Sequence, residues 1–205
     1  MGRPPAISNE QIIAEARRCF LARGANISAV EIARELGVSH TTLFNRFGSK
    51  EGLMVAALGI SDEIPWVAGL ETGPNDYSFV EQLTSHGKII AEYSQSLHAR
   101  MALLQAAGIS HECAMPPQGA SPAPVRAYLA FADWLRRAQD RGLIGDCGVE
   151  TLASTILGAL YSWTLTASAC GHSTTAGARN DYVERFVELI WKGISPVDKQ
   201  LGGDE

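Results

Sequence analysis

The chain has 205 residues, of which 46% are hydrophobic and 19% charged, and its mean hydropathy is zero. This composition excludes a disordered chain and a collagen-like repeat, and it is typical of a globular protein of one or two domains. Four scattered cysteines without a Cys-x-x-Cys pair, and a polar N-terminal stretch without a signal-peptide core, favour a cytoplasmic location.

The net charge of −5 is unevenly distributed along the chain. Residues 1–50 hold seven basic and four acidic side chains, whereas the other 155 residues hold ten basic and eighteen acidic ones. This asymmetry indicates that only the N-terminal segment meets a polyanion such as DNA. An ordinary solvated surface can show the same excess, so the charge alone leaves both alternatives open.

The first sixty residues predict four short helices. Their apolar residues recur at helical spacing, and glycines at 24, 37 and 48 end the first three. The third helix is predicted over 40–47, and the apolar stripe of the fourth ends at Leu58. Ser8 and Asn9 are the candidate N-terminal caps of the first helix, and Ser28, Ser39 and Ser49 can cap the next three.

The rest of the chain predicts longer helices and no strand. A helical extension and then a loop are expected after residue 58, and the proline-rich segment 114–124 is expected to be a surface loop. The helices are predicted over 77–107, 125–141, 151–170 and 178–193. The sequence therefore predicts an all-α fold.

Residues 151–170 carry no charge and are long enough to span a membrane. Seven of these twenty residues are serine or threonine, and no basic cluster flanks either end. A helix buried between its own domain and a second chain explains this pattern better than a membrane span.

The spacing of residues 28–47 predicts a helix-turn-helix. Such a unit needs a small residue where its helices approach, a glycine at the turn, a β-branched residue after it and an apolar residue on the second helix. The chain meets these needs in order with Ala33, Gly37, Val38 and Leu43.

The outer face of the helix over 40–47 has the chemistry of a DNA reader. Short polar side chains, an amide and a guanidinium bind base edges in the major groove and phosphates. The residues expected on this face are Ser39, His40, Thr41, Thr42, Phe44, Asn45 and Arg46.

The run IARELGVSHTTLFNRFGSKEGLMVAAL, from Ile32 to Leu58, resembles the DNA-binding head of the TetR family of bacterial transcriptional regulators. A weaker similarity to the family's penultimate helix covers residues 141–160. The resemblance implies a helix-turn-helix domain over 1–56 and a helical domain over 57–205 that dimerises and binds an inducer. It also implies a cytoplasmic repressor that the inducer releases from a palindromic operator.

Carried over by position, the resemblance places Thr41, Thr42, Phe44 and Asn45 at the groove, and Ser28 and Lys50 at phosphates. Phe44 stands where a tyrosine is frequent, so a hydroxyl contact is lost, although the ring can pack on a thymine methyl.

The resemblance also implies an inducer pocket and a dimer interface. A plain hydrophobic core would use many of the same residues. The pocket candidates are Trp66, Tyr93, His98, Met101, Gln105, Phe131, Trp134 and Trp163. The family's last two helices commonly form the dimer interface, for which the candidates are Leu152, Ile156, Leu160, Phe186 and Ile190.

The sequence shows no strong catalytic or metal-binding motif. His111 with Cys113, and Cys170 with His172, could supply four zinc ligands, but a one-residue spacing is unusual. We therefore expect a protein without enzymatic activity, a bound metal or a cofactor. The expected partners are operator DNA, a small-molecule inducer and a second copy of the chain. Two alternatives remain open: a small-molecule-binding protein with a degenerate head, and a membrane-tethered regulator.

Overall fold

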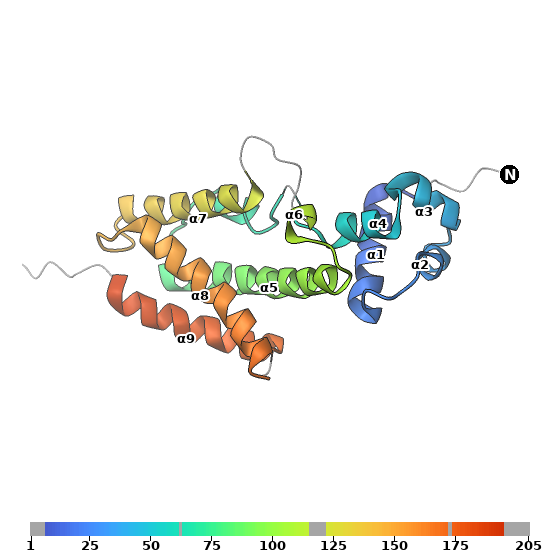
Figure 1. Cartoon of the computed structure of the whole chain (residues 1–205). Coiled ribbons are helices and arrows are strands. Elements are labelled where there is room, and N and C mark those ends of the chain that lie inside the picture. The colour runs from blue at the N-terminus through green and yellow to red at the C-terminus, as the bar shows by residue number, and fades with distance from the viewer. Residues whose placement is uncertain (1–6, 62, 115–121, 172–173, 195–205) are drawn as a thin grey trace, which may run out of the picture. The chain divides into compact units, whose positions relative to one another are not determined.

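The computed structural model describes residues 7–61, 63–114, 122–171 and 174–194. These residues form helices joined by turns and loops, and no strand occurs among them (Figure 1). The predicted all-α class is confirmed.

The chain divides into two compact units. Of the described residues, 7–61 and 96–114 form the first, called here the head unit, and 63–95, 122–171 and 174–194 form the second, the body unit. Helix α5 (Phe79–Ala106) contributes its first part to the body unit and residues 96–106 to the head unit.

The head unit begins with the four predicted helices. They are α1 (Asn9–Arg23), α2 (Ala29–Glu35), α3 (His40–Phe47) and α4 (Lys50–Leu58), and the short α6 (His111–Ala114) follows α5. Each predicted serine cap is confirmed, because its hydroxyl accepts a hydrogen bond from the backbone N–H three residues later at 3.0–3.2 Å.

The core of the head unit unites these helices. Ile12 and Phe20 of α1, Ile32 of α2 and Leu43 of α3 are at most 2% exposed. Leu104, near the end of α5, is 1% exposed and belongs to the same hydrophobic cluster. The end of a helix far along the sequence therefore helps to stabilise the N-terminal unit.

The body unit contains the first part of α5, α7 (Ala123–Asp140), α8 (Val149–Ala169), α9 (Ala176–Ile194) and the 3-10 turn η1 (Ala68–Leu70). Aromatic rings fill its core. Trp134 stacks on Phe79 and on Phe131, with ring centroids 5.3 and 6.2 Å apart.

Two predicted boundaries need correction. Helix α4 ends at Leu58, and the residues that follow adopt no helical extension, since Gly59 already has extended backbone. Helix α7 begins at Ala123, inside the segment predicted as a loop, because Pro124 lies in the first turn, where its missing N–H costs no hydrogen bond. Residues 115–121 of that segment lie outside the described residues.

Several hydroxyl groups in the uncharged stretch of α8 form hydrogen bonds within the helix. Ser154, Thr155 and Thr166 each donate to the carbonyl four residues earlier, at 2.8–3.0 Å. In the described part of the chain, no helix has both the length and the apolar character needed to cross a membrane.

His86 of α5 is expected to make the stability of the body unit depend on pH. Its ring packs edge-on against Trp134, with centroids 5.0 Å apart, and burial lowers the pKa of the imidazole below its usual value of about 6.5. The folded body unit disfavours the charged imidazole. The contribution of neutral His86 to the free energy of unfolding is therefore complete above about pH 6.5 and is lost as the pH falls toward the lowered pKa.

We therefore expect the urea midpoint of the body unit to fall between pH 7.5 and pH 5. His86→Phe should remove this component while keeping an aromatic ring beside Trp134. The lowered carboxyl pKa values, such as that of Glu150, affect stability only below about pH 4.5, so they do not overlap. An unchanged pH profile in the variant would contradict this role for His86.

Candidate functional site

The helix-turn-helix geometry predicted for residues 28–47 is present. Gly37 has φ +66°, a left-handed conformation that favours glycine, and Val38 donates its N–H to the carbonyl of Ala33 at 3.0 Å. Ala33 and Leu43 are each 2% exposed, so they lock the two helices together. Local spacing alone was sufficient to predict this motif.

Helix α3 presents the predicted polar face to solvent. Ser39, His40, Thr41, Asn45 and Arg46 are exposed, whereas Thr42 is half-buried and its hydroxyl lies 2.8 Å from that of Ser39. A face of this composition, on a helix anchored from behind, can enter a major groove.

Phe44, which stands where a tyrosine is frequent in the family, packs against a second aromatic ring. Phe44 is 38% exposed, and its ring centroid lies 4.3 Å from that of His40, one turn earlier on α3. The two rings therefore form one continuous, mainly apolar surface on the exposed side of α3. Such a surface suits the methyl group of thymine.

Two basic side chains that were expected to contact DNA form hydrogen bonds within the head unit. The Arg46 guanidinium donates to the carbonyl of Ile7 at 2.7 Å and to Asn9 Oδ1 at 3.2 Å. The Lys50 ammonium donates to the carbonyl of Ala25 at 2.7 Å, in the loop between α1 and α2. An ammonium has three donor hydrogens, so Lys50 retains capacity for a phosphate.

The predicted cap of α2 is a complete capping box. Ser28 accepts from the N–H of Glu31, whose carboxylate in turn accepts from the Ser28 N–H at 3.0 Å and from its hydroxyl at 2.7 Å. Hydrogen bonds from the Ser28 hydroxyl and backbone lower the pKa of the Glu31 carboxyl. The start of α2 is thereby ordered before any phosphate binds.

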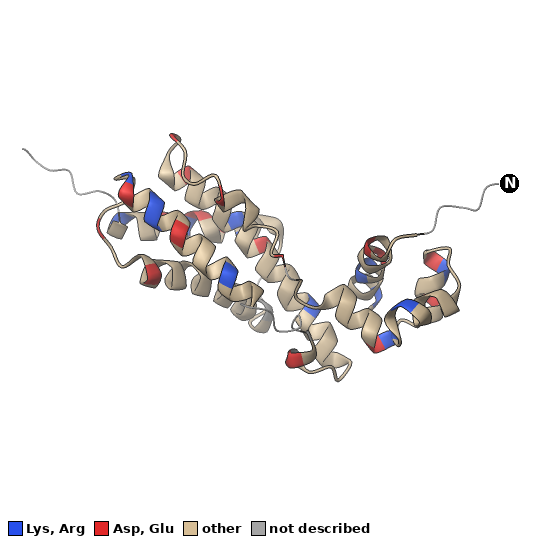
Figure 2. Cartoon of the chain, turned by 90° about the horizontal axis from the view of Figure 1, so that it is seen from above, with Lys and Arg blue, Asp and Glu red and all other residues tan. Residues whose placement is uncertain are grey.

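The charges of the head unit are mixed rather than gathered in one basic patch, as Figure 2 shows. Glu35 at the end of α2 accepts ion pairs from Arg18, at 3.0 Å, and from Arg23, both on α1. This network ties α1 to the helix-turn-helix. Net charge is therefore a weaker indication of a polyanion site here than particular basic side chains and helix N-termini would be.

The same network contains three possible metal-ligand atoms. Those of Glu15, Cys19 and Glu35 lie within 4.8 Å of one another. Both carboxylates are already paired with arginine, and burial, followed by the nearby Glu15 carboxylate, raises the pKa of the Cys19 thiol. A protonated thiol is a poor ligand, so these residues favour an ion-pair network over a metal centre.

Gly52 is an important residue that the motif did not single out. A Cβ atom at this position of α4 would collide with the carbonyl oxygen of Phe47, at the end of α3. The available signal was a glycine inside a helix, which costs roughly 1 kcal/mol relative to alanine and therefore needs a packing reason. Here the reason is the close approach of α4 to α3.

The predicted pocket residues do not form one group. Trp66, Phe131 and Trp134 are buried together in the core of the body unit, and Tyr93 packs against that core. Trp163 stacks on Tyr182, with centroids 5.3 Å apart. The remaining candidates lie on the part of α5 assigned to the head unit: half-buried His98, core-packed Met101 and exposed Gln105.

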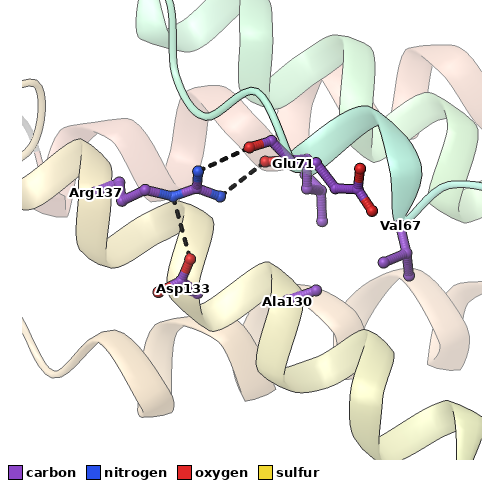
Figure 3. Close-up of a pocket in the computed structure, with 6 residues that line it drawn as sticks. Val67, Glu71, Ala130, Asp133 and Arg137 are labelled. Atoms are coloured by element: carbon purple, nitrogen blue, oxygen red, sulfur yellow. Dashed lines mark hydrogen bonds and ion pairs between the residues drawn. The ribbon is translucent and has the colours of Figure 1, made fainter.

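A hollow of about 260 Å³ lies between η1 and α7 on the body unit (Figure 3). Apolar side chains of Val67, Leu70 and Ala130 line it together with the polar residues Glu71, Asp133 and Arg137. The Arg137 guanidinium donates to the carbonyls of Glu71 and Leu70 at 3.0 and 2.8 Å and pairs with Asp133 at 3.2 Å. These bonds hold η1 against α7.

The two faces of α8 differ in a way that the sequence did not reveal. Leu152, Ile156 and Leu160 are at most 8% exposed and lie in the body unit's own core, while Phe186 and Ile190 of α9 pack partly against it. The exposed face of α8 contains small residues and two large apolar ones: Ser154, Thr155, Gly158, Tyr161, Ser162 and Leu165.

The structure describes the side chains of two of the four zinc ligands considered from the sequence. Cys113 and Cys170 are exposed, and the Cys113 thiol accepts a hydrogen bond from the Ser110 hydroxyl at 3.3 Å. His172 and the side chain of His111 lie outside the described part of the chain.

Comparison with known proteins gives a family match for the head. The sequence model described as "Bacterial regulatory proteins, tetR family" matches residues 12–57. No protein of curated function is similar at the level searched.

Solved structures share the fold over most of the chain. A TetR-family transcriptional regulator from Mesorhizobium loti is 18% identical with a TM-score of 0.66, and the alignment covers 91% of this chain and 96% of that one. One from Streptomyces coelicolor is 21% identical with a TM-score of 0.59, covering 93% and 99%. A transcriptional regulator from Saccharomonospora viridis in complex with choline is 18% identical with a TM-score of 0.60, covering 87% and 94%.

A helix-turn-helix in a chain of further helices is the architecture that this protein shares with those solved regulators. The family match and the shared fold confirm the resemblance seen in the sequence. The chain has the TetR-family fold, and residues 12–57 match the sequence model of the family's N-terminal region.

Proposed function

We propose that the protein is a dimeric, cytoplasmic, one-component transcriptional regulator that represses by binding a palindromic operator through α3. The observation that carries this proposal is the exposed polar face of α3, which Leu43 anchors from behind. We further propose that the protein acts by binding and not by catalysis.

The proposed dimer uses α8 and α9. Apart from Glu150, α8 has no charged residue, and its exposed face combines small side chains with Tyr161 and Leu165, which are 46% and 38% exposed. Small residues let a second helix approach closely, and the large ones supply apolar area. A two-fold dimer would place two α3 helices on two half-sites.

The proposed inducer binds in the body unit and lowers operator affinity. We expect this inducer to be largely apolar, because the aromatic rings around Trp134 supply large contact areas without charge. Helix α5 contributes to both units and is therefore suited to carry an effect of the inducer to the head. Coupling of this kind requires different inducer affinities for the two states of the protein.

The test is fluorescence anisotropy of the purified protein on DNA flanking its own gene and on random DNA of equal length, at two salt concentrations. We expect preference for the native fragment, with two chains bound per site. Equal binding to both DNAs, followed by failure of a genomic selection to enrich any sequence, would instead support a small-molecule-binding protein with a degenerate head.

Asn45 is expected to act in sequence reading and Lys50 in phosphate binding. Asn45→Ala should weaken binding to the operator by about 5- to 150-fold, because one base contact is typically worth about 1–3 kcal/mol, and should leave binding to random DNA nearly unchanged. Lys50→Ala serves as the matched contrast, since it should weaken binding to every sequence and flatten the salt dependence. Parallel losses on both DNAs for Asn45→Ala would remove Asn45 from the base readers.

A further inference from the structure

The C-terminal end of α4 is held by two arginines from other helices. Gly59, the residue after α4, has φ −62° and ψ 173°, so the helix lacks the left-handed glycine that often satisfies final carbonyls. Arg17 of α1 donates from Nε to the carbonyl of Ala57 at 2.6 Å. Arg100 of α5 donates from Nη1 to the carbonyl of Gly59 at 2.9 Å and to that of Leu58 at 3.4 Å.

Arg100 lies inside the head unit rather than on its surface. It is 5% exposed, and Leu104, one turn further along α5, is 1% exposed in the head core. The carbonyl end of a helix has a partial negative charge, which attracts a guanidinium. Burial strengthens this interaction, since few water molecules compete for the donors or acceptors.

The other end of α4 is joined closely to α3. Ser49 caps α4 immediately after the turn at Gly48, and Gly52 lies directly against the Phe47 carbonyl. A displacement at the far end of α4 would therefore be transmitted to α3 instead of being absorbed between the two helices.

We propose that Arg100 is a positioning residue for operator recognition, holding α4 and, through it, the orientation of α3. The inference rests on the proposed DNA-binding function and adds the residue by which α5 sets the geometry of the head. Arg100 acts indirectly, because its buried side chain cannot reach DNA. Sequence-specific binding requires this orientation, whereas contacts with phosphates tolerate small rotations of α3.

The test compares Arg100→Met, which keeps an unbranched stem without donors, with Arg100→Lys, which keeps the charge. We expect methionine to weaken operator binding roughly tenfold, the size of one lost charge-assisted hydrogen bond, and to change binding to random DNA less than twofold. Lysine should restore most of the affinity. The salt dependence on random DNA should stay that of the unaltered protein.

A double variant separates positioning from general loss of stability. Arg17 and Arg100 bind neighbouring carbonyls of one helix end, so the Arg17→Met and Arg100→Met losses should combine non-additively in operator affinity. Measurements at a temperature well below each variant's melting midpoint keep all proteins folded. Equal losses on operator and random DNA, or lower stability with unchanged operator affinity, would overturn the proposal.

Hydrogen exchange provides a readout that needs no DNA. Arg100→Met should accelerate amide exchange at the end of α4 and in α3, with α9 of the body unit as the internal reference. If the unaltered protein prefers no DNA sequence, the proposed function fails, and exchange still decides whether Arg100 holds α4. Unchanged exchange in both helices would overturn the positioning role. Should methionine prevent folding, Arg100→Lys is compared in both assays, with a smaller effect of the same pattern expected.

Discussion

Gly52→Ala is expected to lower the free energy of unfolding of the head unit by about 3 kcal/mol, the upper range for overpacking a well-packed site. The added Cβ atom would collide with the Phe47 carbonyl oxygen, which belongs to the backbone and cannot rotate aside. Relief requires α4 to move away from α3, and α4 is held at its other end by Arg17 and Arg100. Operator binding should therefore be lost even where the head still folds.

Urea denaturation followed by circular dichroism would measure this loss. Gly177→Ala is the matched control, since Gly177 also lies in a helix but a Cβ atom there would meet nothing within 4 Å. It should be neutral or stabilising by up to about 1 kcal/mol, because alanine is the better helix former. If the two alanine variants have the same stability and operator affinity, the close approach at Gly52 is not a constraint.

Gly158→Leu is expected to convert the proposed dimer into monomers and thereby abolish tight operator binding. Gly158 lies midway along the exposed face of α8, and a Cβ atom there meets nothing in its own chain within 4 Å. The variant should therefore fold normally as a single chain. A leucine between two closely packed α8 helices would separate them and remove contacts along the whole face.

Light scattering coupled to size-exclusion chromatography would measure the mass of each variant at low micromolar concentration. Gly158→Ala is the size control, because a methyl group fits between helices that pack through small residues, and this variant should remain dimeric. A monomeric head binds only one half-site, so Gly158→Leu should retain weak binding to random DNA. A dimer that persists in Gly158→Leu would place the interface on another surface.

The head was predictable because its determinants are local. Serine caps, glycines that end helices and the spacing from Ala33 to Leu43 all act within a few residues, and each predicted helix of the head is present. The polar face of α3 followed from the same periodicity, since Leu43 fixes which side of the helix is buried. That the face binds DNA remains a proposal.

The body was less predictable because its helices are apolar on more than one side. In α8, both faces lack charge, so periodicity could not tell Leu152, Ile156 and Leu160, which fill the body's own core, from the exposed face around Gly158. The pocket candidates were chosen by residue type, and folding distributes them between two units.

The sequence by itself determined an all-helical protein with a helix-turn-helix and the side chains that α3 exposes. Only the tertiary structure decided how that motif is held: Gly52 against Phe47, and Arg17 and Arg100 on the last carbonyls of α4. The physical reason is sequence distance. Caps and turns join residues three or four apart, whereas Arg100 binds a carbonyl 41 residues earlier, a contact that exists only when the helices have packed.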